Sequence, residues 1–214
     1  MSSTEAPFAK YPAFQPMFER AEDVPVPVYL VLLNVSIGSE IAITILRRIL
    51  EGDTELMPQV VALLADFNWR PQLVGAVAMG LGAANEESRD ALWRAFDSGS
   101  WVSPQLAAIA FLVDEDFEAR SRLRIEAGCP INLDRLQGLD WVVRHSAAGP
   151  GNAASHSSKA LSALASLCQR LPETHVWLEP ILSREETQHS LRNDYDGGGR
   201  IATGWIDGFV RMRE

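Results

Sequence analysis

Histidine and cysteine are the residues of this 214-residue chain whose types could support nucleophilic catalysis or bind a metal. Cys129 and Cys168 do not form a C-x-x-C unit, and we expect both to be buried free thiols without a redox role. The four histidines are His145, His156, His175 and His189. No two of them have the i, i+4 spacing of a helical zinc site, and no serine lies in a nucleophile elbow. The sequence therefore predicts no catalytic residue, no metal site and no cofactor.

The glycine-rich stretch 194–199, Asp-Tyr-Asp-Gly-Gly-Gly, is the next candidate for chemistry. It has carboxylates beside a glycine, as calcium loops do, but the glycine and the terminal glutamate are not at EF-hand positions. The glycines are also not followed by the Lys-Ser/Thr pair of a phosphate-binding loop. We expect a flexible, exposed acidic loop in which Asp194 and Asp196 are candidates for contact with a partner.

Acidic residues also cluster at 114–118, Asp-Glu-Asp-Phe-Glu, ahead of three arginines. Acid at the start of a helix and base toward its end is the order that the helix dipole favours, so the run has a structural explanation. The net charge of the chain is −9. Such a surface repels nucleic acid and anionic lipid and attracts basic proteins, although many proteins are acidic for solubility alone. The candidates for contact with a basic partner are Asp114, Glu115, Asp116 and Glu118.

A short motif, a tryptophan followed closely by Pro-Gln-Leu, occurs twice in the chain, at Trp69 and at Trp101. Its prolines, Pro71 and Pro104, are 33 positions apart, and a period of this size is typical of stacked helical hairpins. Each tryptophan stands just before its helix, where it could be a hydrophobic staple on the first turn or an aromatic anchor for a partner. Equivalent positions in equivalent repeats favour the staple, and both tryptophans stay candidates for partner binding.

The apolar pattern around this motif predicts two pairs of helices, over 54–66 and 71–82 and then over 86–98 and 104–113. The second helix of each pair is rich in Ala and Gly. Small residues let helix axes approach closely, which suits a buried inner helix. No segment has the alternating pattern of a strand, and we therefore predict an all-α fold.

We expect one helical domain over residues 27–214, with clear repeats over 54–116 and an irregular C-terminal third. Residues 1–26 form a proline- and aromatic-rich segment that cannot be one long helix and that we expect on the domain surface. No apolar run is long enough to cross a membrane, and the N-terminus lacks the layout of a signal peptide. We therefore expect a cytoplasmic protein.

The paired helices, the tryptophan-containing linkers and the 33-residue spacing resemble HEAT-like α-helical repeat proteins. This resemblance implies a short α-solenoid of antiparallel helical hairpins. Small acidic helical proteins of this build are also similar to the immunity proteins of bacterial polymorphic toxins.

Our leading hypothesis is a non-enzymatic immunity protein that neutralises a basic toxin domain by stoichiometric binding, with neither nucleic acid nor a membrane as its partner. A scaffold or adaptor subunit that binds a peptide is the first alternative. The second is an enzyme related to the DNA-base glycosylases built on HEAT-like repeats. The net charge of −9 disfavours that enzyme, because a DNA-binding groove needs Lys and Arg.

Overall fold

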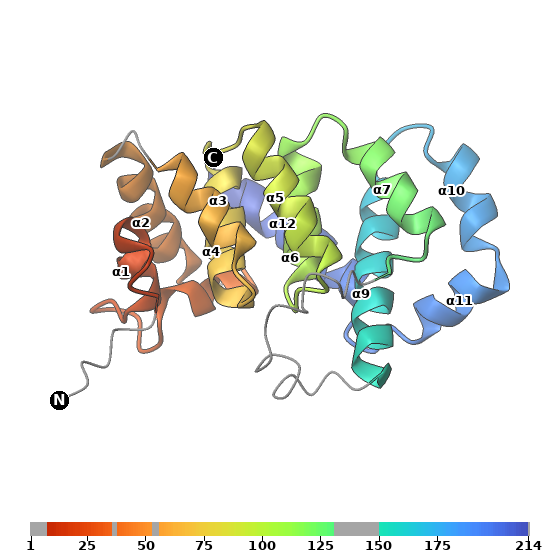
Figure 1. Cartoon of the computed structure of the whole chain (residues 1–214), viewed down its shortest axis with the longest axis horizontal. Coiled ribbons are helices and arrows are strands. Elements are labelled where there is room, and N and C mark those ends of the chain that lie inside the picture. The colour runs from red at the N-terminus through yellow and green to blue at the C-terminus, as the bar shows by residue number, and fades with distance from the viewer. Residues whose placement is uncertain (1–7, 36–37, 53–55, 131–149, 214) are drawn as a thin grey trace.

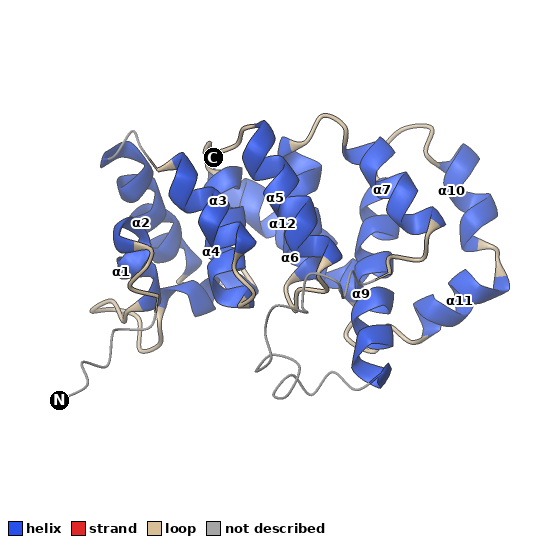
Figure 2. Cartoon of the chain, in the orientation of Figure 1, coloured by secondary structure: helices blue, strands red, loops and turns tan. Residues whose placement is uncertain are grey.

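Helices form the regular secondary structure of this protein. The structure is a computed structural model, and it describes residues 8–35, 38–52, 56–130 and 150–213. Figure 2 shows helices and loops over these ranges, with no strand among them, so the predicted all-α fold is confirmed. None of the described helices is both long and apolar enough to cross a membrane.

The helices follow one another along the chain with mostly short connections (Figure 1). The helices predicted between residues 54 and 113 correspond to α3, α4, α5 and α6. The elements are η1 (Pro12–Phe14), α1 (Gln15–Phe18), η2 (Val28–Leu33), α2 (Ser39–Gly52), α3 (Met57–Ala65), α4 (Trp69–Gly80), α5 (Glu86–Asp97), α6 (Ser103–Val113), α7 (Phe117–Glu126), α9 (Pro150–Cys168), α10 (His175–Leu182), α11 (Glu185–Arg192) and α12 (Gly198–Arg213).

Asparagine caps determine where two of these helices begin. The Asn85 side chain accepts a hydrogen bond from the backbone N–H of Ser88 at 2.8 Å, and the Ser88 hydroxyl accepts one from the Asn85 N–H at 2.9 Å. The Asn68 side chain accepts from the backbone N–H of Arg70 at 3.0 Å. Helix α4 therefore begins at Trp69, inside the linker that we predicted, and this tryptophan lies in the first turn rather than before it.

The two predicted pairs of helices pack side by side. Helix α3 packs on α4 and α5 packs on α6, while α3 also contacts α5 and α4 contacts α6 (Figure 1). Helices α4 and α6 are the inner pair, since every residue over 71–80 and 103–110 is buried. Ala76 and Ala108 are fully buried, and a Cβ added to Gly75 would lie only 3.0 Å from a side chain of α3. The small residues therefore permit the close approach that we expected.

The C-terminal third, which we expected to be irregular, forms α9, α10, α11 and α12 in its described part. Helix α12 packs against both α9 and α6 and extends back toward the N-terminal elements (Figure 1). The Trp205 indole donates a hydrogen bond to the carbonyl of Leu32 at 2.8 Å, and Arg47 donates to the carbonyl of Arg213 at 2.8 Å. The last helix is thereby joined to η2 and α2 near the beginning of the chain.

The described part of the N-terminal segment belongs to the core rather than to the surface alone. Tyr11, Phe14 and Met17 are buried. The carboxylate of Asp66, at the end of α3, accepts a hydrogen bond from the Tyr11 hydroxyl at 2.5 Å and pairs with Lys10 at 2.7 Å. Burial by itself raises the pKa of Asp66, but the hydrogen bonds from Lys10, Tyr11 and a backbone N–H lower it overall. The segment is thus anchored to the end of α3.

Ala76→Leu and Ala108→Leu should each destabilise the protein, because the inner helices have no room for a larger side chain. We expect a loss of about 1–3 kcal/mol in the free energy of unfolding for each variant. Ala119→Leu is the matched control, since Ala119 is exposed on α7 and the same substitution there should be tolerated. Urea unfolding followed by circular dichroism gives the three values. Equal midpoints for all three variants would show that the inner helices are not tightly packed.

Candidate protein-binding edges

The partner-binding residues predicted from the sequence lie at opposite ends of α6. Trp101 precedes this helix and Asp114 follows it, so a helix of about 16 Å separates them, at about 1.5 Å per residue. Trp69 and Asp196 lie on the side of Trp101, and residues 115–118 lie on the side of Asp114. We name the first side the tryptophan edge and the second side the acidic edge.

The acidic edge is formed by exposed carboxylates in the first turn of α5 and at the start of α7: Glu86, Glu87, Glu115, Asp116 and Glu118. The helix dipole favours acid at both places. Two ion pairs hold the helices together, Arg120 with Asp90 at 2.8 Å and Arg124 with Asp97 at 2.7 Å. The acidic side chains therefore start from helix ends that are fixed relative to each other. Glu86 and Glu87 were not among the predicted contact residues, because their nearness to the 114–118 cluster depends on how α5 packs beside α7.

Asp114 differs from the rest of its cluster, because its carboxylate is used inside the protein. The residue is 7% exposed, and it accepts a hydrogen bond of 2.6 Å from the indole of Trp93. Arg120 lies 3.5 Å from the same carboxylate oxygen. Asp114 therefore positions the turn between α6 and α7. Glu118 is exposed but accepts a hydrogen bond of 2.9 Å from Trp177 in α10, so it is partly engaged as well.

The tryptophan edge is a row of aromatic rings with cations over them. The ring centroids of Trp69 and Trp101 are 5.0 Å apart, and Tyr29 packs edge-on against Trp69 at 5.8 Å. Arg70 lies 4.7 Å over the Trp69 ring and donates to the Tyr29 hydroxyl at 2.9 Å. Lys159 lies 5.0 Å over the Trp101 ring. The two tryptophans therefore pack on each other, and Trp101, which is 47% exposed, also remains open to solvent.

Lys159 of α9 joins Asp196 to this edge. Its buried ammonium group donates a hydrogen bond to the carbonyl of Trp101 at 3.1 Å and lies 3.5 Å from the Asp196 carboxylate. Asp196 and Trp101 are thus brought together, as candidates for the same contact. Asp194 has a different role, because its carboxylate accepts a hydrogen bond of 2.6 Å from the backbone N–H of Gly198 at the start of α12.

The glycines that follow Asp194 serve close packing rather than a free loop. Gly198 and Gly199 are buried in the first turn of α12, against α9. A Cβ added to Gly198 would collide with the carbonyl of Lys159, and one added to Gly199 would collide with the hydroxyl of Ser166. The expected flexible loop is therefore shorter than 194–199, since its last two residues are helical. The apolar stripe from Ile201 onward is the pattern in the sequence that indicates a helix beginning near these glycines.

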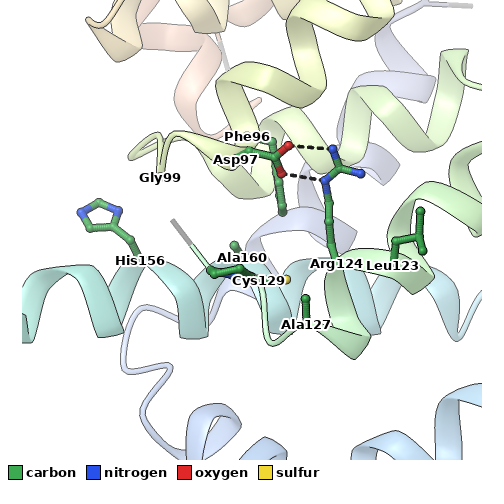
Figure 3. Close-up of a pocket in the computed structure, with 10 residues that line it drawn as sticks. Phe96, Asp97, Gly99, Leu123, Arg124, Ala127, Cys129, His156 and Ala160 are labelled. Atoms are coloured by element: carbon green, nitrogen blue, oxygen red, sulfur yellow. Dashed lines mark hydrogen bonds and ion pairs between the residues drawn. The ribbon is translucent and has the colours of Figure 1, made fainter. Parts of the chain in front are cut away.

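A cavity of about 320 Å³ lies between the ends of α5 and α7 and the side of α9 (Figure 3). Arg124 and Asp97 span it with two hydrogen bonds of 2.7 Å, so the guanidinium fork is engaged. Cys129 lines the cavity, and burial raises the pKa of its thiol, which keeps it protonated at neutral pH. Burial also raises the pKa of Cys168, to about 12, and lowers the pKa of His156. Neither thiol is activated as a nucleophile.

Within the described ranges, no three His, Cys, Asp or Glu side chains gather in a way that could hold a metal ion. No family model, no curated protein and no solved structure matches this chain.

Gly198→Ala and Gly199→Ala should destabilise the protein, because each new methyl group forces α12 away from α9. We expect losses on the order of 1–3 kcal/mol. Gly204→Ala is the matched control within the same helix, since an added Cβ there meets nothing within 4 Å. It should be neutral or stabilise the helix by roughly 0.5–1 kcal/mol. Thermal unfolding compares the three variants, and a common response would mean that α12 does not approach α9 so closely.

Proposed function

We propose that this chain is a non-enzymatic binding protein with a short HEAT-like solenoid at its centre. In this proposal it is an immunity protein that neutralises a basic toxin domain in the cytoplasm by forming a one-to-one complex. The acidic edge is the observation that supports the proposal. Among the described residues, Glu86, Glu87, Glu115 and Asp116 make no ion pair, so their charge is available to a partner.

Preorganisation is the physical reason why this edge suits capture. The ion pairs between α5 and α7 and the hydrogen bond between Trp93 and Asp114 hold the two helix ends in place before any partner arrives. Rigid contact surfaces lose less conformational entropy on binding, which increases the affinity that a given set of contacts can reach.

Charge adds speed to this capture. A protein of net charge −9 that has several unpaired carboxylates together on one edge attracts a basic domain and orients it during the encounter. Electrostatic complementarity of this kind mainly raises the association rate and the selectivity between partners. Fast association is what a neutralising protein needs, because the toxin acts until it is bound.

The double variant Glu86→Lys/Glu87→Lys should associate with the partner roughly tenfold more slowly than the wild type at low salt. The partner is first isolated from the native host on the immobilised chain, and stopped-flow fluorescence then gives the association rate. Glu185→Lys/Glu186→Lys is the matched control, since it makes the same charge change in the first turn of α11. The difference between the two variants should shrink as salt rises, because the Debye length falls to about 3 Å at 1 M.

Equal slowing by both double variants would show that total charge matters and the acidic edge does not. Association that is indifferent to salt would remove the electrostatic part of the proposal. Protection of cells by much less than one equivalent of this chain per toxin would contradict stoichiometric neutralisation itself.

A further inference from the structure

A groove between the C-terminal ends of α3 and α5 has no part in the acidic edge. Its volume is about 250 Å³, and its lining includes Leu64, Ala65, Phe67, Arg94, Ala95 and Ser98. We propose that this groove binds a short peptide segment of a protein partner in which a carboxylate side chain stands next to an apolar one. The proposal is independent of the toxin partner at the acidic edge.

A second groove of the same kind lies one repeat later, between α5 and α7 (Figure 3). Its charged pair, Asp97 with Arg124, joins the two helices there. Asp97 is the last residue of α5, and the last residue of α3 is Ala65. Arg124 lies three positions before the C-cap of α7, and the residue at the same position in α5 is Ala95. The first groove therefore has two methyl groups where the second has an ion pair, which leaves an apolar floor.

Arg94 supplies a cation to the lining of this groove. It makes no ion pair and no side-chain hydrogen bond with any residue that the structure describes. Asp66 lines the same groove, but its carboxylate forms an ion pair with Lys10 at 2.7 Å. Asp97, one turn further along α5, forms an ion pair with Arg124. The guanidinium fork of Arg94 is thus available for a carboxylate from another molecule, which it can bind through two hydrogen bonds.

The surroundings of the groove fit the same ligand. Phe67, which is 51% exposed, lines the groove and offers an apolar contact beside Arg94. Gln72 also lines the groove and accepts a hydrogen bond from Ser100, next to the exposed Trp101, so the groove adjoins the tryptophan edge. Exposed aromatic and arginine side chains are the types that most often dominate binding energy at protein interfaces.

Charge and shape favour a peptide over a nucleic acid strand. The net charge of −9 opposes a long polyanion, which needs a row of cations, whereas one carboxylate needs only Arg94. The accessible apolar lining, Ala65 and Phe67, matches an aliphatic or aromatic side chain rather than a phosphate.

Selection from a phage-displayed random dodecapeptide library on the immobilised full chain tests the proposal. We expect enriched peptides to have Asp or Glu beside Leu, Ile, Val or Phe. A labelled synthetic copy of the enriched peptide then reports affinity by fluorescence anisotropy. Arg94→Glu should weaken binding roughly tenfold or more, and Arg94→Lys should weaken it less, because lysine keeps the charge but loses the fork. Phe67→Ala should weaken binding as well.

Arg192→Glu, at the exposed end of α11, is the matched charge control and should leave the affinity unchanged. Glu86→Lys/Glu87→Lys should also leave it unchanged, so that failure at this groove and failure at the acidic edge are separate results. Enrichment of basic peptides, or an affinity indifferent to Arg94 and Phe67, would overturn the proposal. Tighter binding of an oligothymidine strand than of any selected peptide, lost in Arg94→Glu, would assign the groove to nucleic acid instead.

Discussion

Direct contact between buried helices that have no room for a methyl group is the constraint on which the rest of this structure depends. A Cβ added to Gly80 of α4 would lie 2.6 Å from Ile109 of α6 and 2.8 Å from Phe209 of α12. A Cβ added to Gly208 would lie 2.9 Å from Val35. Helices α4 and α6 and the C-terminal helix α12 therefore fix one another's positions. Because protein interiors are close-packed, a shift in one of them is passed to the others.

The outer helices take their positions from this inner layer. Helices α3 and α5 pack directly on α4 and α6, and α7 packs on α9. Both candidate edges are then consequences of where α6 begins and ends, since Trp101 and Asp114 flank it. The internal hydrogen bond from Trp93 to Asp114 and the contact of Lys159 with Trp101 show how each end is tied to a neighbouring helix.

Local patterns were enough to predict α3, α4, α5 and α6, because helix caps and small-residue faces act within one or two turns. The role of α12 was missed because its partners, such as Leu32 with Trp205, are far away in sequence. The burial of Asp114 was missed for a related reason. A run of acid suggests a solvated surface, and only the position of Trp93, 21 residues earlier, shows that one carboxylate turns inward. Composition cannot separate that carboxylate from its exposed neighbours.

The two kinds of candidate site have a common origin in helix polarity. Helices α5 and α7 run side by side in the same sense, as the pairs Asp90–Arg120 and Asp97–Arg124 require. Their positive dipole ends therefore meet at the acidic edge, and their negative ends favour cations in the last turn. Arg94 of α5 and Arg124 of α7 occupy those last turns. Arg124 has an internal carboxylate partner, and among the described residues Arg94 has none. The parallel helices α5 and α7 thus have acid at one end and base at the other, and one missing acid is enough to leave a cation available for a partner.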